Sequence, residues 1–304
     1  MARVARLDKA ALFQQLRYAP HSGQQEVHDS TAHRRVLACG VRWGKTLCGG
    51  MEAVIALMAP RRESRGWVVG PTQDLAGRVF REIEIAVRQH FPHRVEEISR
   101  HRILMRNLGG GISEVVAKTA DHPVSLLGES LHWVIVDEAA RVREEVWTRY
   151  LSQRLVDHDG WALFLSTPHG CNWFRELYKI GERELDPDFA SWNSPSQNNP
   201  HLDPRVIENE RMRLSRDDFR EQYLAEFLGA ENEPCESCGA PSPMAKGMVL
   251  LESGVEPRVC GTCGEPVEED GTTLVQLSPN GHRVCTHIVL EDVADRDAVC
   301  LPDT

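Results

Sequence analysis

Apolar runs alternate with segments of helical periodicity along the first part of the chain, a pattern typical of an α/β protein. The apolar run 36–38 is followed by a predicted helix from Lys45 to about Met58. The apolar strand 66–72 ends in Gly-Pro-Thr and precedes a predicted helix over residues 73–90. Four apolar residues recur at helical spacing in this second helix: Leu75, Val79, Ile83 and Val87.

Further strands are predicted along the chain. Residues 103–118 indicate a β-hairpin that turns on residues 107–111. No helix signal follows the three glycines of that turn, so a second phosphate loop is not expected there. Residues 131–137 form a β-branched apolar run, as expected of a buried parallel strand, and residues 161–168 form a similar run that ends in Ser-Thr-Pro. A short helix is predicted over residues 8–17.

Charge is distributed unevenly over the 304 residues. Residues 1–229 carry 31 acidic and 31 basic side chains, whereas residues 230–304 carry 14 acidic and 4 basic ones and account for the net charge of −10. Because contacts to DNA phosphates need Lys and Arg, any DNA contact is expected on basic patches of the first part. No apolar run approaches the ~20 residues that span a bilayer, and the amino terminus lacks the apolar region of a signal peptide, so no membrane partner is expected.

The segment from Cys39 to Thr46 has the order strand, glycine-bearing loop, Gly-Lys-Thr and helix, which is typical of nucleotide phosphate binding. Backbone N–H groups of the loop from Gly40 to Gly44 would face the β-phosphate of ATP. Lys45 would reach the β- and γ-oxygens, and the Thr46 hydroxyl would bind Mg²⁺. Cys39 replaces the usual first glycine, so this segment alone leaves a chance helix start as the alternative.

Polar side chains end both of the later apolar strands. The carboxyl ends of parallel strands form the site edge of doubly wound sheets, so Asp137 and Glu138 are expected at that edge. Asp137 would hold Mg²⁺, directly or through water, and Glu138 would orient and deprotonate the attacking water. The hydroxyls of Ser166 and Thr167 would lie beside the γ-phosphate and sense its presence. The alternative for Asp137 and Glu138 is a strand that happens to stop in a polar turn, and Ser-Thr-Pro by itself is too common a tripeptide to indicate a site.

A Pro and a Gln lie just ahead of the phosphate loop, in the stretch Tyr18-Ala-Pro-His-Ser-Gly-Gln24-Gln25. A Gln amide offers a donor and an acceptor together, which suits the edge of adenine. Its position favours Gln24 over Gln25 as an adenine-binding residue. The alternative is a polar loop that enters a helix.

Together, and in this order, these motifs resemble one family, the ATPase domain of the large terminase subunits of tailed phages, which package double-stranded DNA into procapsids. The resemblance covers about residues 16–229 and rests on six motifs: Tyr18-x-Pro20-x-x-x-Gln24, Arg42-Trp43-Gly44-Lys45-Thr46, Val136-Asp137-Glu138-Ala139-Ala140, Ser166-Thr167-Pro168-x-Gly170-x-Asn172-Trp173-Phe174, Asn199-Pro200-x-Leu202 and Phe219-x-x-x-Tyr223-x-x-Glu226-Phe227. It implies a three-layer, RecA-like P-loop NTPase fold of the additional-strand, catalytic-Glu class. It also implies that the Ser-Thr-Pro strand couples hydrolysis to DNA movement, and that Cys39 is a tolerated variation.

Two arginine positions of the family bear on the chemistry. Arg42 lies where many members have an arginine inside the loop, and the resemblance implies contact with the γ-phosphate or a link to the coupling strand. Many members also carry an arginine that acts on the ATP of a neighbouring subunit, but that position is Leu127 here. An arginine finger typically contributes ~10³–10⁵ in rate, so a substitute is expected. The candidates are Arg141, Arg143, Arg149 and Arg154.

The end of the chain departs from the family pattern. In full-length members an RNase H-like nuclease follows near Phe227, but only 75 residues follow Gly229, so no nuclease activity is expected from this chain. Instead, two Cys-x-x-Cys-Gly sequences lie there, 21 residues apart. This spacing predicts a small zinc-ribbon-like module rather than disulfides, with unpaired or redox cysteines as the alternative. The predicted zinc ligands are Cys235, Cys238, Cys260 and Cys263, with Cys285, near His282 and His287, as a spare ligand.

The sequence therefore predicts four segments: an N-terminal segment with the adenine motif (1–30), a P-loop ATPase core (31–185), a helical lid or linker (186–229) and a four-cysteine zinc-ribbon-like module with an acidic tail (230–304). The predicted function is a Mg²⁺-dependent, DNA-stimulated ATPase subunit of a packaging motor. The resemblance implies a homo-oligomeric ring on the portal protein, with double-stranded DNA and the terminase small subunit as further partners. Because no nuclease is expected in this chain, a separate nuclease subunit is a further expected partner. The expected location is the host cytoplasm and, transiently, the procapsid portal.

Two other functions are compatible with parts of this pattern. A helicase-like DNA translocase also uses Gly-Lys-Thr and Asp-Glu, but such helicases use two ATPase cores and residues 1–229 hold one. A terminase-derived adaptor that does not hydrolyse ATP would account for Leu127 in the arginine-finger position. However, a site that has lost its activity has no chemical reason to keep all four of its key polar residues: Lys45, Thr46, Asp137 and Glu138.

Overall fold

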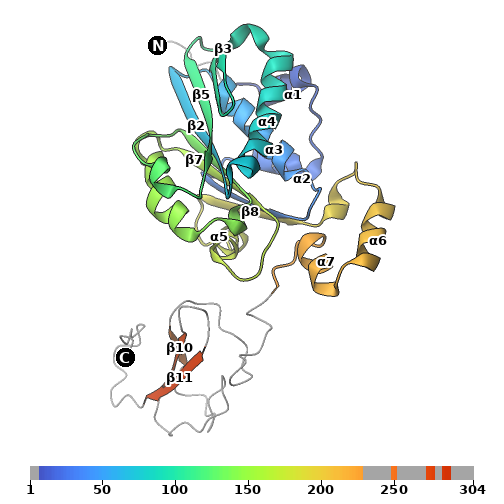
Figure 1. Ribbon diagram of the computed structural model, residues 1–304, viewed down its shortest axis with the longest axis vertical. Helices are drawn as coiled ribbons and strands as arrows, with labels where there is room; N and C mark the ends of the chain where they lie inside the picture. The colour runs from blue at the N-terminus through green and yellow to red at the C-terminus, as the bar shows by residue number, and fades with distance from the viewer. Residues whose placement is uncertain (1–6, 229–247, 252–271, 278–282, 289–304) are drawn as a thin grey trace. The chain divides into compact units, whose positions relative to one another are not determined.

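The computed structural model describes residues 7–228, 248–251, 272–277 and 283–288 (Figure 1). The chain divides into two compact units, Met1–Phe227 and Leu228–Thr304. The described residues of the second unit form an antiparallel sheet in the order β11-β10-β9, with the bounds β9 (Met248–Leu251), β10 (Thr272–Leu277) and β11 (Arg283–Ile288).

An eight-stranded mixed sheet forms the centre of the first unit, in the order β3-β4-β5-β2-β6-β7-β1-β8. The strands from β5 to β8 in this order are parallel, while β4 is antiparallel to both of its neighbours. The strand bounds are β1 (Arg34–Cys39), β2 (Glu63–Gly70), β3 (Val95–Ile98), β4 (Arg102–Arg106), β5 (Ile112–Thr119), β6 (Trp133–Asp137), β7 (Trp161–Ser166) and β8 (Phe189–Ser194). Because β7 lies between β1 and β6, the carboxyl ends of these three strands meet at one edge of the sheet.

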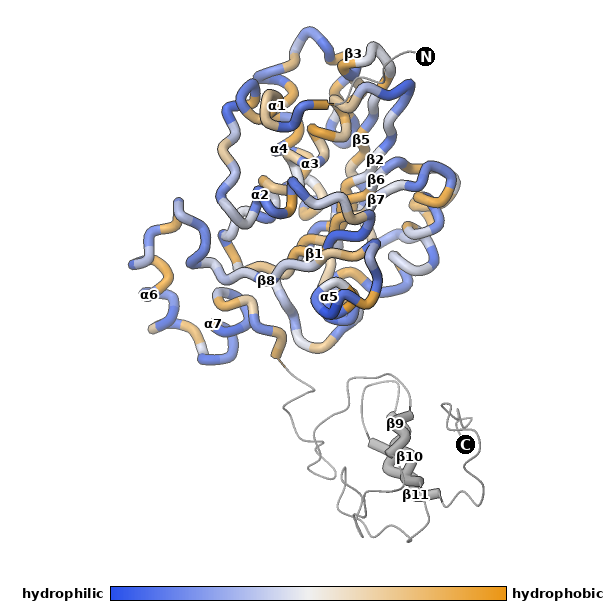
Figure 2. Tube along the Cα trace, turned by 180° about the vertical axis from the view of Figure 1, so that it is seen from behind, coloured by the Kyte–Doolittle hydropathy of each residue, from blue (hydrophilic) through white to orange (hydrophobic). Residues whose placement is uncertain are grey.

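Helices cover both faces of this sheet (Figure 1), and hydrophobic residues concentrate on the strands between them (Figure 2). One face packs against α1 (Lys9–Leu16), α2 (Ser22–Asp29), α3 (Lys45–Met58) and α4 (Gln73–His90). The other face packs against η2 (Pro123–Leu126), η3 (Ala139–Arg141), η4 (Val146–Leu151), η5 (Ser152–His158) and α5 (Trp173–Glu182). The first unit is therefore a three-layer α/β structure.

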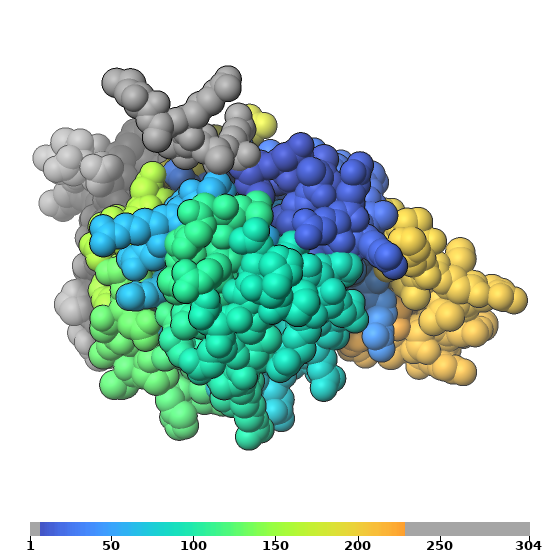
Figure 3. Space-filling model, turned by 90° about the horizontal axis from the view of Figure 1, so that it is seen from above, coloured from blue at the N-terminus to red at the C-terminus, as the bar shows by residue number. Residues whose placement is uncertain are grey.

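The remaining helices lie at the margins of the first unit. They are η1 (Pro92–Arg94), η6 (Ser196–Asn198), α6 (Pro204–Arg213) and α7 (Arg216–Gln222). Figure 3 shows α6 and α7, in yellow and gold, projecting from one side of the unit. Within the described part of the chain, no helix is both long and apolar enough to cross a membrane.

The composition of α3 explains its central position. Nearly all of its residues are buried, so it has no solvent-facing side and packs between the sheet and α4. Two glycines permit this close packing: a Cβ atom on Gly49 would lie 2.6 Å from Leu165 Cδ1, and one on Gly50 would lie 2.7 Å from Glu82 Cβ. The helix that begins at the phosphate loop is thus fixed rigidly against the sheet.

Several predicted elements are confirmed. Helices α3 and α4 have the predicted bounds, and α4 begins where the Thr72 hydroxyl accepts a hydrogen bond from Leu75 N. The predicted hairpin is β4–β5, and its turn is held by the Asn107 side-chain oxygen, which accepts from Gly109 N and Gly111 N. The predicted strands correspond to β1, β2, β6 and β7. The sequence pattern did not predict β8, which pairs with β1.

Candidate active site

The phosphate loop connects the end of β1 to the start of α3 at the edge where β1, β6 and β7 meet. Gly44, the residue before α3, has a φ of +104°, which favours glycine. Gly40 also needs to be small, since a Cβ atom there would lie 2.4 Å from Ser196 Oγ and 2.7 Å from the Tyr223 carbonyl oxygen. Thr46 is the second residue of α3 and is half-buried. A tight loop therefore leads directly into the N-terminus of α3. Backbone N–H groups at such a helix N-terminus form an anion-binding site.

Lys45 connects this loop to β7. Its buried ammonium donates to the Cys39 carbonyl oxygen at 2.6 Å, the Gly40 carbonyl oxygen at 2.8 Å and Thr167 Oγ1 at 3.0 Å. Burial lowers the pKa of Lys45, although the nearby thiol and carboxylates favour its charged form. The described residues give this ammonium neutral oxygen partners and no ion pair. A buried cation without an ion pair provides a charge that fits a phosphate.

Asp137 and Glu138 follow one another at the end of β6. Asp137 is 3% exposed and its Oδ1 accepts a hydrogen bond from Glu138 N at 3.1 Å. Burial, and after it the charge of Glu138, raises the pKa of Asp137 to about 7. Glu138 has a φ of +51°, a left-handed conformation that is unusual for a residue with a side chain. Strain of this kind is concentrated at functional sites.

Ser166 and Thr167, at the end of β7, contact both sides of the site. Ser166 Oγ lies 3.5 Å from Glu138 Oε2 and donates to the Thr167 carbonyl oxygen at 2.8 Å. Thr167 Oγ1 accepts from Lys45. In the register of the sheet, Ser166 pairs with Ala38 of β1, and Leu165 pairs with Asp137 of β6. The structure thus brings Lys45, the two carboxylates and the two hydroxyls together.

Gln24, the predicted adenine-binding residue, lies beside the phosphate loop and is 4% exposed. Its Nε2 donates to the Gly44 carbonyl oxygen at 3.2 Å, and its Oε1 accepts from His21 N at 3.2 Å. His21 adds a second contact, with its Nε2 3.1 Å from the Trp43 carbonyl oxygen. A Gln amide can make four hydrogen bonds, so a donor and an acceptor remain for a ligand. The contact from His21 was not predicted, because a His in a loop carries no signal for it.

Arg42 occupies the tip of the loop. It has a φ of +62° and its side chain is exposed, while its carbonyl oxygen accepts from Asn199 Nδ2 at 2.7 Å. The structure therefore does not bring the Arg42 side chain into contact with the other predicted residues. The backbone of the loop, by contrast, is held firmly.

The segment after β8 holds the phosphate loop in a way that the sequence did not predict. Val41 N donates to the Gln222 carbonyl oxygen at 2.7 Å, and Ser196 Oγ donates to the Val41 carbonyl oxygen at 2.6 Å. The end of α7 also reaches the loop after β7, since Glu221 Oε1 accepts from Gly170 N at 2.6 Å. Asn199 and Tyr223 belong to motifs quoted above. Asn199 holds the loop with its side-chain amide, through the hydrogen bond to the Arg42 carbonyl oxygen. Gln222 and Tyr223 contribute backbone carbonyl groups, which leave no pattern in a sequence.

Comparisons with known proteins decide the family. The profile of the family described as "Terminase large subunit, T4likevirus-type, N-terminal" matches residues 36–234. The chain belongs to the terminase large-subunit family. It is 35% identical over 262 residues to the terminase large subunit of Thermus phage G20c, which covers 76% of this chain and 53% of that protein. It is 29% identical over 204 residues to that of Escherichia phage T5, which covers 66% of this chain and 45% of that protein.

Solved terminase structures share the fold. The ATPase domain of the Thermus phage P74-26 large terminase has a TM-score of 0.67 and 33% identity, and the match covers 74% of this chain and 100% of that one. The large terminase of a thermophilic bacteriophage in complex with ADP has a TM-score of 0.55 at 16% identity, covering 74% of this chain and 54% of that one, and shows the fold alone. These matches are consistent with the predicted RecA-like P-loop fold. The chain spans about half the length of the curated relatives that it matches.

The terminase finger position, Leu127, is 50% exposed and follows η2. Of the four alternative arginines, Arg143 pairs with Glu145 at 2.8 Å, and the Nε of Arg154 is buried without a hydrogen-bond partner among the described residues. Arg141 and Arg149 are exposed. Arg149 belongs to η4, which packs against η2 and so lies close to the Leu127 segment.

The predicted zinc ligands Cys235, Cys238, Cys260 and Cys263 lie outside the described residues. The spare ligand Cys285 and its neighbour His287 lie in β11, of which only the backbone is described, and His282 is outside the described residues. Among the residues that the structure describes, no group of three or more His, Cys, Asp or Glu side chains could hold a metal ion. The zinc-ribbon-like module therefore stays a prediction.

Proposed function

We propose that this chain is the ATP-hydrolysing motor subunit of a phage terminase, which moves double-stranded DNA into procapsids. The observation that carries the proposal is the buried Lys45 ammonium, which contacts the loop carbonyls and Thr167 beside the Asp137–Glu138 pair. An ammonium in that position suits the β- and γ-phosphates of ATP. The additional-strand, catalytic-Glu class of P-loop fold is part of the proposal and is supported by the position of β7 between β1 and β6.

Each residue of the site has a proposed role. Lys45 and the loop N–H groups hold the phosphates, and Gln24 contacts adenine through its remaining donor and acceptor. The hard oxygen ligands of Asp137 and Thr46 suit Mg²⁺, which when bound neutralises charge on the phosphates. Glu138 orients a water molecule and accepts its proton. Ser166 contacts Glu138 and Thr167 contacts Lys45. These two hydroxyls therefore respond to the presence of the γ-phosphate and transmit the change to β7.

The proposal for the wider assembly is based on membership of the family. We propose a homo-oligomeric ring on the portal protein, with double-stranded DNA and the terminase small subunit as partners, in the host cytoplasm and transiently at the procapsid portal. We also propose that Cys235, Cys238, Cys260 and Cys263 bind one Zn²⁺. Metal analysis of the purified chain tests this last point: about one zinc per chain is expected, and Cys238→Ser should remove it.

The proposed hydrolysis is tested by replacing Glu138 with Gln. ATPase activity, measured with and without double-stranded DNA, should fall by ~10²–10⁴-fold in Glu138→Gln, because the general base is lost while the shape of the side chain is kept. Glu145→Gln is the matched control, since Glu145 pairs with Arg143 away from the loop. A parent chain without ATPase activity would leave the adaptor function as the better account. Equal activity in the parent and Glu138→Gln would remove Glu138 from the proposed mechanism.

A further inference from the structure

Helix α2 carries Gln24 and lies against α3, the helix of the phosphate loop. It has eight residues, too few for a helix that is stable by itself, so contacts with the rest of the protein must set its position. Gln24 and His28 are one turn apart on its buried face and are 4% and 0% exposed. Each of these two side chains contacts α3 or the residue that begins it. The position of Gln24 therefore depends on two points of attachment.

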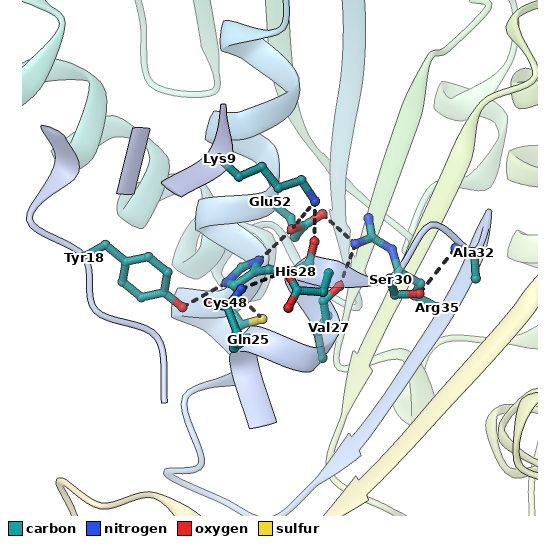
Figure 4. Close-up of polar contacts among 11 residues, drawn as sticks. Lys9, Tyr18, Gln25, Val27, His28, Ser30, Ala32, Arg35, Cys48 and Glu52 are labelled. Carbon is teal, nitrogen blue, oxygen red and sulfur yellow. Dashed lines mark hydrogen bonds and ion pairs between the residues drawn. The ribbon is translucent and has the colours of Figure 1, made fainter. Parts of the chain in front are cut away.

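The first point is Gln24 itself, through its hydrogen bond to the Gly44 carbonyl oxygen. The second point is His28, whose Nδ1 lies 2.6 Å from Glu52 Oε1 (Figure 4). Glu52 is the eighth residue of α3, two turns beyond Lys45. The two attachments thus join both ends of α2 to the same rigid helix.

The His28 ring is held on both sides. A carboxylate accepts hydrogen bonds, so Nδ1 carries the proton that faces Glu52. Nε2 lies 3.0 Å from the Tyr18 hydroxyl oxygen, and burial raises the pKa of Tyr18, which keeps that hydroxyl protonated. Lys9 Nζ donates to the carbonyl oxygen of His28. With both ring nitrogens and the backbone engaged, this end of α2 has a single position.

Glu52 is equally constrained. Its Oε2 accepts from Arg35 NH1 at 2.6 Å, and the same guanidinium nitrogen donates to the Val27 carbonyl oxygen of α2 at 3.2 Å. Burial by itself would raise the pKa of Glu52, but Arg35 and the hydrogen bond from His28 outweigh it and lower that pKa to about 2. Glu52 is therefore an anion in the protein interior. Buried ion pairs add little net stability, so a role in fixing one arrangement of α2 and α3 accounts better for this network.

We infer that His28 and Glu52 are positioning residues, which set the place of the Gln24 amide beside the phosphate loop and thereby the preference of the site for adenine. This inference rests on the proposed function, in which Gln24 contacts the base. The amide must meet the donor and acceptor of adenine within about 0.5 Å, and guanine presents the reverse pattern at the same edge. A small shift of α2 should therefore lower kcat/KM for ATP more than kcat/KM for GTP.

The experiment measures kcat/KM for ATP and for GTP in the full chain and compares their ratio between variants. Gln24→Ala defines the ratio without base recognition. His28→Ala should lower the ATP/GTP ratio about five- to tenfold, mainly through a higher KM for ATP, as expected for a weakened hydrogen bond. His28→Asn places an amide nitrogen near the former Nδ1 and should restore most of the ratio. Tyr18→Phe, which removes only a hydroxyl, should give a smaller change in the same direction and replaces His28→Ala if that variant does not fold.

A double variant and a stability control separate the explanations. Gln24→Ala/His28→Ala should have the ratio of Gln24→Ala alone, because His28 acts through Gln24. Leu155→Ala, in the core on the opposite face of the sheet, should lower stability and leave the ratio unchanged. If Gln24→Ala changes the ratio and neither His28→Ala nor Tyr18→Phe does, the positioning role is wrong and the adenine role stands. If Gln24→Ala itself leaves the ratio unchanged, the proposed adenine contact fails, and the positioning role fails with it.

Discussion

The Nζ atom of Lys45 lies 3.0 Å from the hydroxyl oxygen of Thr167, so the phosphate loop and the end of β7 share one hydrogen bond. Thr167 is the residue after β7, whereas Lys45 begins α3. The contact therefore joins the element that would bind phosphate to the strand that would respond to it. A phosphate that draws the Lys45 ammonium away would break this hydrogen bond. The loop after β7 would then have two states, one with the Thr167 hydroxyl bonded to Lys45 and one with it released.

Replacing Thr167 with Val tests this relationship. The change keeps the shape of the side chain and removes one of the three acceptors of Lys45, so the kcat of DNA-stimulated hydrolysis should fall about five- to tenfold. Thr148→Val is the matched control, because that hydroxyl only donates to the Glu144 carbonyl oxygen within the same helical segment. Steady-state ATPase assays at saturating DNA give the answer, and equal kcat values for the parent and Thr167→Val would contradict the coupling role.

How much of this site could be predicted differs from residue to residue. The Gly-Lys-Thr loop, the Asp-Glu pair and the Ser-Thr-Pro strand were predicted, because parallel strands deliver their carboxyl ends to one edge and the register confirms that they meet. The support of the loop by Gln222 and Tyr223 was not predicted. It uses backbone carbonyl groups, which every residue has, and a chain fold that only tertiary structure defines.

The buried pair of His28 and Glu52 was missed for a different reason. A Glu in an otherwise apolar helix is expected to be exposed to solvent. Here, however, the Arg35 guanidinium and the His28 ring form hydrogen bonds with the Glu52 carboxylate inside the protein. Charge compensation between distant residues has no local signal in a sequence. Strand β8 was missed because its residues, Phe189–Ser194, alternate without a clear apolar face.

The pKa of Asp137 predicts how stability depends on pH. Burial raises this pKa from 3.8 to about 7, so between these values the folded chain binds a proton that the unfolded chain has lost. The contribution of Asp137 to the free energy of unfolding is thus complete below about pH 4 and is lost as the pH rises through about 7, at about 1.4 kcal/mol per pH unit. Chemical denaturation in Mg²⁺-free buffer between these pH values should show this slope, and Asp137→Asn should lack it. A parallel pH profile in the two proteins would mean that Asp137 is ionised throughout.

Arg42 is predicted to act in catalysis and not in folding. Its side chain is exposed, so Arg42→Ala should leave the melting temperature nearly unchanged. If the guanidinium reaches the γ-phosphate once nucleotide binds, kcat should fall ~10²-fold with little change in KM. Arg62→Ala, an exposed arginine after α3, is the control. Intact DNA-stimulated hydrolysis in Arg42→Ala would show that the charge on the γ-phosphate is met by another group.

Arg149 is the arginine that we expect to replace the missing finger, because it is exposed on η4, which packs against the segment that leads to Leu127. Arg149→Ala should then lower hydrolysis in the proposed ring by ~10³-fold while nucleotide binding to the single chain is unchanged. Arg143→Ala is the matched control, since its ion pair with Glu145 already engages that guanidinium.

A mixing assay distinguishes action on a neighbouring subunit from action within one chain. Arg149→Ala keeps an intact phosphate loop but lacks Arg149, whereas Lys45→Met keeps Arg149 but lacks the lysine of the loop. Each variant alone should therefore be inactive. If Arg149 acts on the neighbour, a mixture of the two should regain part of the DNA-stimulated activity, because some interfaces then pair an intact loop with an intact arginine. A mixture as inactive as its components would place the Arg149 effect within the chain. The same mixture made with Arg141→Ala in place of Arg149→Ala tests the other exposed candidate. If activity is restored only in the mixture with Arg141→Ala, the finger role belongs to Arg141.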